Sequence, residues 1–147
     1  VPPMTEARFE EIRLMRELLE PEAAARALPA MSRSQIQKLM RFDDAIDLAM
    51  RTKNVARYMQ SNADFHFTLY SAYPQPVTLR LIETLWLQTG PFQGYVINQW
   101  GVQNLKDQHE LALEAIQKRD PIKLKAAIKQ DISDGMRLIK EHLAMMK

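Results

Sequence analysis

Apolar residues recur along most of this chain at intervals of three and four, and the strict alternation typical of half-buried strands is nowhere sustained. Glycine, which weakens helices, occurs only four times in 147 residues. The pattern therefore predicts an all-α protein. Six helical segments are expected, at residues 5–28, 33–51, 55–73, 77–100, 101–118 and 121–145, the fourth of them with a break near Gly90 and Pro91.

The ends of these segments carry residues that start or stop helices. Thr5 and Ser32 are suited to cap helix N-termini, and Asp120 is suited to do so with Pro121 at the first helical position. Pro21 is expected to kink or restart the first helix. Because the links between segments are short, we expect consecutive helices to pack antiparallel in a bundle.

Composition is typical of one globular domain, since 46% of the residues are hydrophobic and 147 residues can bury a core. The net charge of +2 does not by itself indicate a nucleic-acid-binding surface. The absence of cysteine excludes disulfides and thiolate metal sites. No apolar run approaches the roughly 20 residues of a membrane-spanning helix, and no signal segment opens the chain, so a cytoplasmic protein without a membrane partner is expected.

Polar side chains interrupt the apolar faces of three predicted helices. Asn62 and His66 lie one turn apart on the third, His109 lies on the fifth and Asp131 on the sixth. A buried carboxylate needs a cation beside it, and two neutral imidazoles with a carboxylate suit zinc, nickel or manganese. These four residues are therefore candidate metal ligands, with the Asn62 amide as the weakest donor. Hydrogen-bonded core residues without a metal are an equal alternative.

Arg16 lies on the apolar face of the first predicted helix, with Glu20 one turn further on. This spacing somewhat favours an ion pair at the rim of the bundle. The alternative is a guanidinium that turns inward and clamps an anionic ligand. His142 also lies near an apolar face, but in the last turn of its helix, where we expect it to complement the helix dipole or to contact solvent.

Three segments, in this order, resemble the motifs of one family. Residues 16–24 are similar to an opening R..LEP.AA motif, residues 62–69 to a D..FH..L motif, and residues 108–120 to an EH..I..AI..GD motif. The family is the FadR-type C-terminal (FCD) domain of GntR-type bacterial transcription regulators, and the resemblance covers nearly the whole chain. It implies an antiparallel bundle of six to seven helices around an internal effector pocket.

Many members of this family hold a divalent metal through one Asp and three His. The resemblance implies that the corresponding positions here are Asn62, His66, His109 and Asp131. The chain thus departs from the pattern twice, with Asn at the position of the Asp and Asp at the position of one His. The altered set could hold a metal more weakly, bind an organic acid, or bind nothing. Arg119 replaces the usual Gly, which we interpret as a loop variation.

The resemblance also implies a function, as the ligand-sensing and dimerisation half of a DNA-binding transcription regulator. Residues 1–4 are expected to be the remnant of a linker, and no winged helix-turn-helix domain is recognised in residues 5–147. DNA would then be bound only through a separate N-terminal domain. The expected effector is a small organic acid, with Arg16, Tyr70 and Trp86 as pocket contacts, and its binding would shift the population between two bundle arrangements.

Two other functions stay open at this point. One is a structural dimerisation module with a degenerate metal site, because Leu14, Leu18 and Ala25 form a second apolar strip on the first helix that is suited to contact another subunit. A homodimer is expected in either case. The other is a helical-bundle metalloenzyme of the di-iron type. It is disfavoured because no histidine has a Glu three residues before it, and we expect no enzyme activity.

Overall fold

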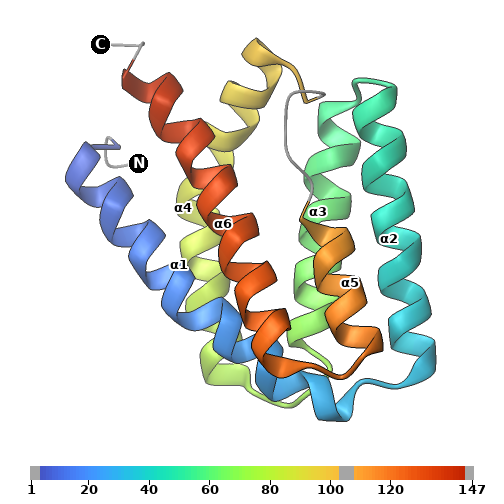
Figure 1. Cartoon of the computed structure of the whole chain (residues 1–147). Helices are drawn as coiled ribbons and strands as arrows, with labels where there is room; N and C mark the ends of the chain where they lie inside the picture. Colours follow the sequence, from blue (N-terminus) through green and yellow to red (C-terminus); the bar gives the residue numbers. More distant parts are fainter. Residues whose placement is uncertain (1–3, 103–107, 145–147) are drawn as a thin grey trace.

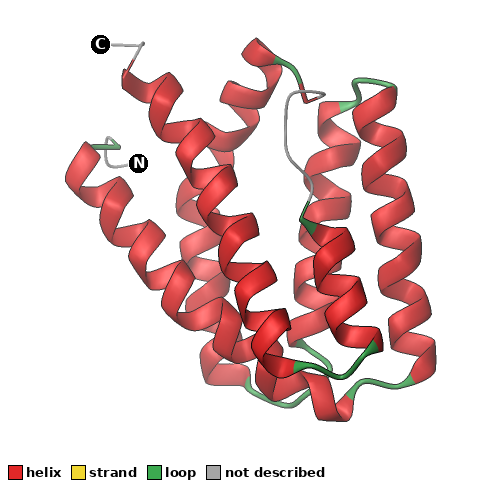
Figure 2. Ribbon diagram, viewed as in Figure 1, coloured by secondary structure: helices red, strands yellow, loops and turns green. Residues whose placement is uncertain are grey.

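A computed structural model describes residues 4–102 and 108–144 and confirms the all-α fold. Within this part of the chain, six α-helices and one short 3-10 helix follow one another and no strand occurs (Figures 1 and 2). The elements are α1 (Glu6–Ala27), η1 (Leu28–Ala30), α2 (Arg33–Arg51), α3 (Val55–Tyr70), α4 (Pro76–Trp100), α5 (His109–Gln117) and α6 (Pro121–Ala144).

Consecutive α-helices run in opposite directions, as predicted for an antiparallel bundle (Figure 1). Helix α1 packs along α6 and α4, α2 packs along α3, and α5 packs against α2 and α6. The start of α1 and the end of α6 lie at the same end of the bundle. Buried residues in the middle of α3 therefore share one interior with buried residues of α1, α4, α5 and α6.

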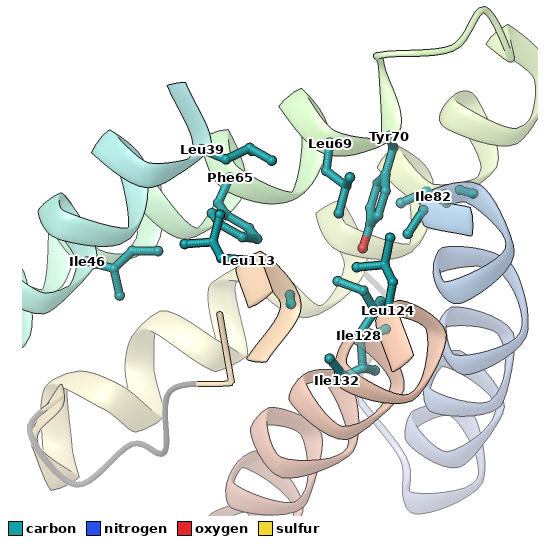
Figure 3. Close-up of a cluster of buried hydrophobic side chains, with 14 of the residues drawn as sticks. Leu39, Ile46, Phe65, Leu69, Tyr70, Ile82, Leu113, Leu124, Ile128 and Ile132 are labelled. Atoms are coloured by element: carbon teal, nitrogen blue, oxygen red, sulfur yellow. The ribbon is translucent and has the colours of Figure 1, made fainter. Parts of the chain in front are cut away.

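The core is built from aliphatic and aromatic side chains that all six α-helices contribute. Figure 3 shows part of it, with the hydroxyl group of Tyr70 directed among aliphatic side chains. A hydroxyl group at this depth needs hydrogen-bond partners, and His66 and Glu20 supply them. The largest fully buried side chains are Tyr70, Phe9, Phe65, Leu39, Ile46, Leu69, Ile82, Ile97, Ile116, Leu124, Ile128 and Met136.

The predicted N-caps are present at three helices. Thr5 Oγ1 accepts the backbone N–H of Arg8 at 3.1 Å. Ser32 and Gln35 form a reciprocal capping box, with distances of 3.1 and 2.7 Å. Asp120 Oδ1 accepts the backbone N–H three residues further on at 3.0 Å, and Pro121 begins α6. These side chains replace hydrogen bonds that the first turn of a helix lacks, and they fix where α1, α2 and α6 begin.

Two predicted breaks do not occur. Helix α1 continues through Pro21 to Ala27, and α4 continues through Gly90 and Pro91 to Trp100. A proline inside a helix removes one backbone hydrogen bond. In α1 the residues after Pro21 are strong helix formers, and Pro21 itself is buried against the bundle. Packing stabilises these helices more than one missing hydrogen bond destabilises them, so the predictions of a restart and of a break were wrong.

Helix α3 ends at Tyr70, three residues earlier than predicted. The Gln75 side chain explains this end, because its Nε2 donates to the backbone carbonyls of Tyr70 and Ala23 at 2.9 and 3.0 Å. One buried amide group thus terminates α3 and ties it to α1.

Helix α5 begins at His109, not near residue 101, so His109 is the first residue of its helix and not a residue in the middle. Residues 103–107 of the expected fifth helix lie outside the described residues, as do residues 1–3 of the expected linker remnant and residue 145 at the expected end of the last helix. Among the described helices, none combines the length and the apolar character needed to cross a membrane.

Arg119 has a structural role that its replacement of the family's usual Gly did not suggest. Its φ of 53° is in the left-handed region that favours glycine. Its guanidinium donates to the backbone carbonyls of Leu28 and Met31, at 2.7 and 2.8 Å. The side chain therefore joins the link between α5 and α6 to the link between α1 and α2, and it offsets the backbone strain at its own position.

We predict that Arg119→Gly destabilises the protein by about 1 kcal/mol, because the loss of two charge-assisted hydrogen bonds outweighs the relief of backbone strain. Lys53→Gly is the matched control, since Lys53 has a φ of 58° in an exposed turn. We expect the control to change stability by less than about 0.5 kcal/mol. Urea unfolding of both variants measures the difference, and equal stabilities would contradict a role of the Arg119 side chain.

Candidate metal centre

The side chains of His66, His109 and Asp131 meet inside the bundle, from α3, α5 and α6. His66 Nε2 lies 2.9 Å from Asp131 Oδ2 and 3.3 Å from His109 Nε2. His109 Nε2 lies 3.7 Å from the same Asp131 oxygen. The side chains of the two histidines are 1% and 2% exposed and that of Asp131 is 16% exposed. Three potential metal ligands therefore converge within 4.8 Å of one another.

Local sequence explains how each side chain reaches this point. His66 lies on the buried face of α3, one turn before Tyr70 and one turn after the buried Asn62. His109 enters at the first turn of α5, where the Phe65 ring packs edge-on against it with centroids 4.6 Å apart. Asp131 precedes the buried Ile132 on the face of α6 that is turned inward. The apolar neighbours thus bury the three polar groups together.

The charge of Asp131 is stabilised by its surroundings. Burial alone would raise the pKa of this carboxyl group, but His109, the hydrogen bond from His66 and the guanidinium of Arg16 lower it to about 2. Asp131 is therefore a carboxylate at neutral pH. A buried carboxylate that faces two imidazole nitrogens is a suitable arrangement for binding a cation.

A cavity of about 360 Å³ adjoins the cluster. Asp131 lies on its wall, and so does Asn62, which places the fourth residue of the predicted ligand set beside the acid. Gly135, one turn after Asp131, leaves open space where a side chain would otherwise project. The complete lining is Arg16, Tyr58, Asn62, Gln93, Ile97, Asp131, Ile132, Asp134, Gly135, Met136, Arg137, Leu138, Ile139 and Glu141.

A second polar cluster surrounds the buried carboxylate of Glu20. Arg16 Nε donates to Glu20 Oε2 at 2.7 Å, while the Tyr70 hydroxyl and Trp86 Nε1 donate to Glu20 Oε1 at 2.9 and 3.0 Å. The Arg16 guanidinium also lies over the Trp86 ring, 4.6 Å from its centroid. The predicted ion pair of Arg16 with Glu20 thus exists, but it is buried, with residue exposures of 6% and 0%. It does not lie at the rim.

The two clusters share one hydrogen bond. The Tyr70 oxygen lies 2.9 Å from His66 Nδ1, on the side of the imidazole ring opposite Asp131. Burial and the neighbouring Glu20 raise the pKa of Tyr70 well above its usual value, so its hydroxyl group keeps its proton. His66 is thereby held between Tyr70 and Asp131.

Of the three predicted effector contacts, Arg16 lines the cavity, whereas Tyr70 and Trp86 are absent from its described lining and contact Glu20 instead. His142, in the last turn of α6, lies with its Nδ1 2.6 Å from the backbone carbonyl of Leu138, and its ring contacts that of Trp100 at a tilt of 47°, with the centroids 4.3 Å apart. It is not part of the metal-ligand group found among the described residues.

Sequence reasoning missed the central role of Glu20 and the cavity residues Gln93 and Gly135. Glu20 was treated only as a partner for Arg16, although its place one turn further along the buried face was a signal of its depth. Gly135 follows Asp131 by one turn on the inward side of α6, and a glycine at such a position indicates a close approach or a space.

Comparisons with known proteins show the family and the fold of the chain. The sequence model of the FCD domain family matches residues 11–134. Among solved structures, McbR/YncC of E. coli superposes with a TM-score of 0.89 at 20% sequence identity, over 97% of this chain and 72% of that chain. At this identity, the superposition shows a shared fold. No curated protein sequence matches the chain.

Proposed function

The chain belongs to the FCD domain family, the FadR-type C-terminal domain of GntR-type transcription regulators, and we propose that it senses a small organic acid through a bound divalent metal ion. The observation that carries this proposal is the convergence of His66, His109 and Asp131 beside a cavity. A non-enzymatic regulatory domain is the coarser function that family membership supports.

The donor spacing fits a small divalent ion. Zinc bonds of roughly 2.0–2.1 Å at tetrahedral angles place ligand atoms roughly 3.3–3.4 Å apart. The three distances among His66 Nε2, His109 Nε2 and Asp131 Oδ2 are 2.9, 3.3 and 3.7 Å, which lie around that value. Two imidazoles and a carboxylate also suit nickel and manganese. We propose the Asn62 amide oxygen as a fourth, weaker ligand from the adjoining wall of the cavity.

The charges around the cavity favour an anionic effector. The Arg16 guanidinium is compensated by Glu20, and that of Arg137 lies 3.0 Å from Asp134 Oδ1. A divalent ion carries one positive charge more than the adjacent Asp131 carboxylate compensates, and this local excess would attract a carboxylate to the ion, while the exposed Glu141 balances the charge of the cavity as a whole. Arg16 is the proposed direct contact of the effector, while Tyr70 and Trp86 would support it through Glu20.

The proposed mechanism is a shift between two arrangements of the bundle. Residues of α1, α3, α4 and α6 line the cavity, and α1 and α6 pack along each other. An effector with different affinities for two positions of these helices changes their populations. DNA would be bound by a separate N-terminal domain that α1 follows in the chain, and this role would place the protein in the cytoplasm.

The direct contacts between His66, His109 and Asp131 also favour a second candidate, a structural dimerisation module with a degenerate metal site. In that case the three side chains satisfy one another by hydrogen bonds and no metal binds. The cavity beside Asp131 is the feature that this alternative leaves without a role.

We predict that the purified protein binds about one divalent ion per chain, measured by elemental analysis and by calorimetric titration of the metal-free protein with Zn²⁺. His66→Ala and His109→Ala should each abolish binding, because each removes one of three strong donors. Asp64→Ala is a matched control on α3, since Asp64 bonds to Gln60 on the exposed side. Absence of metal from the wild type, with no heat of Zn²⁺ binding, would support the degenerate site instead.

The cavity can be tested without changing a ligand. Gly135→Leu places a side chain in the open space, so we expect it to abolish binding of organic acids such as citrate and succinate while Zn²⁺ affinity remains within about threefold. Gly135→Ala should leave acid binding intact and stabilise α6 by about 0.5–1 kcal/mol. Undiminished acid binding by Gly135→Leu, in calorimetry, would show that the effector binds elsewhere.

We further propose that the domain forms a homodimer through the apolar strip on α1. Leu14 and Leu18 are 50% and 55% exposed, and α4, which packs against α1, exposes Leu87 at 78%. The neighbouring Glu10 and Glu17 are both paired with Arg13, at 2.8 and 3.1 Å, and Glu10 is also paired with Lys140 at 2.6 Å. These four residues have no net charge that would oppose a second copy of the same surface.

The dimer predicts that joint substitution of Leu14→Glu and Leu18→Glu yields a folded monomer, because it places like charges opposite each other in an apolar contact. Sedimentation equilibrium gives the mass of each variant. Ile122→Glu on α6, at a residue that is 79% exposed, is the control and should remain dimeric. A wild-type monomer, or an unchanged dimer after the double substitution, would contradict this interface.

A further inference from the structure

Glu20 is the acceptor for donors from three helices. Its carboxylate is fully buried and accepts from Arg16 on its own helix α1, from Tyr70 on α3 and from Trp86 on α4. The arginine and indole nitrogens can only donate. A carboxylate that is paired with a guanidinium can only accept, so the single hydrogen of the Tyr70 hydroxyl group points to Glu20.

This direction determines the state of His66. Once its hydrogen is given to Glu20, the Tyr70 oxygen can only accept from the nitrogen that lies 2.9 Å away on its other side, which is His66 Nδ1. Nδ1 must therefore carry a proton. His66 Nε2 faces Asp131 Oδ2 at 2.9 Å and His109 Nε2 at 3.3 Å. When a metal ion takes the place of the hydrogen that Nε2 donates to the Asp131 carboxylate, a ring protonated at Nδ1 presents the Nε2 lone pair to the ion.

We infer that Tyr70 and Glu20 are positioning residues of the metal centre, which hold His66 as the Nδ1–H tautomer and so present its Nε2 to the ion. The inference rests on the proposed metal site and adds an outer shell to the predicted ligands. Tyr70 lies outside the matched motifs, and Glu20, which lies within the first of them, was expected only as an ion-pair partner of Arg16. Outer-shell partners of this kind typically change metal affinity by about 10- to 100-fold when they are removed. The same carboxylate also holds Arg16 at the cavity wall, so one group orients both the metal ligand and the proposed effector contact.

Two variants alter this chain of hydrogen bonds in different ways. Tyr70→Phe keeps the ring and removes the acceptor of His66 Nδ1. Glu20→Gln keeps the shape of the side chain, but its carbonyl oxygen is drawn to the charged Arg16 Nε. The amide NH₂ group then turns toward Tyr70, and Trp86 Nε1–H, the other donor to Oε1, loses its acceptor. The Tyr70 hydroxyl group must then donate to His66 Nδ1, so the hydrogen bond reverses. Both variants should convert His66 to the Nε2–H tautomer.

The experiment measures the Zn²⁺ affinity by calorimetry and the protonation of His66 Nδ1 by nitrogen-15 NMR of the metal-free protein. We expect Nδ1 to be protonated in the wild type and unprotonated in Tyr70→Phe and Glu20→Gln, with Zn²⁺ affinity about 10- to 100-fold lower in both. Tyr73→Phe is the matched control, since it removes a hydroxyl from a tyrosine that is 41% exposed just beyond α3. It should retain wild-type affinity and the wild-type tautomer.

The possible outcomes separate this inference from the proposed function. If the wild type binds Zn²⁺ and the folded variants bind it within threefold, the positioning role is overturned while the metal site stands. If the wild type binds no Zn²⁺, the proposed metal site is wrong. If Nδ1 of His66 is unprotonated in the metal-free wild type, the positioning role of Tyr70 and Glu20 is wrong, whatever the Zn²⁺ affinity. Circular dichroism confirms that each variant is folded, and one folded variant of the two is sufficient for the test.

Discussion

A carboxylate cannot be buried in a protein without cations or hydrogen-bond donors around it, and this bundle buries two. Glu20 is satisfied by three donors and Asp131 is surrounded by His66, His109 and Arg16. Because the donors come from different helices, the two acids determine how α1, α3, α4, α5 and α6 must meet. The polar interior is therefore part of the fold, and the hydrophobic core alone would not fix these side chains in one arrangement.

Periodicity predicted the fold well because a helix face follows from spacing alone. It placed His66, His109 and Asp131 on inward faces, and the structure brings all three together. Capping residues located the starts of α1, α2 and α6, because a cap is a local interaction between residues three apart. Local rules failed at Pro21 and within α4, where contacts distant in the sequence outweigh the preference of a single residue.

Spacing indicates which way a side chain points, but it does not give its depth or its partners. Glu20 and Arg16 were assigned correctly to neighbouring turns, yet the burial of the pair depends on α3, α4 and α6 packing over it. In the same way, the contact of Tyr70 with Glu20 joins residues fifty positions apart. Such contacts follow from the crossing of helices, which no pattern within one helix specifies. This is why the meeting of His66, His109 and Asp131 could be predicted from the sequence and the contacts around Glu20 could not.

The two departures from the family pattern compensate each other in charge and change the position of the acid. With Asn at 62 and Asp at 131, the site keeps one carboxylate, but that carboxylate belongs to α6 and also lines the cavity. Its neighbours in the cavity are Gly135 on the same helix and Arg16 on α1. An anion in the cavity would therefore contact α6 through the metal centre and α1 through the guanidinium. Since α1 and α6 pack along each other, a ligand that bridged them would act on the relative position of the two helices, and under the proposed function this displacement would be passed to a DNA-binding domain that precedes α1.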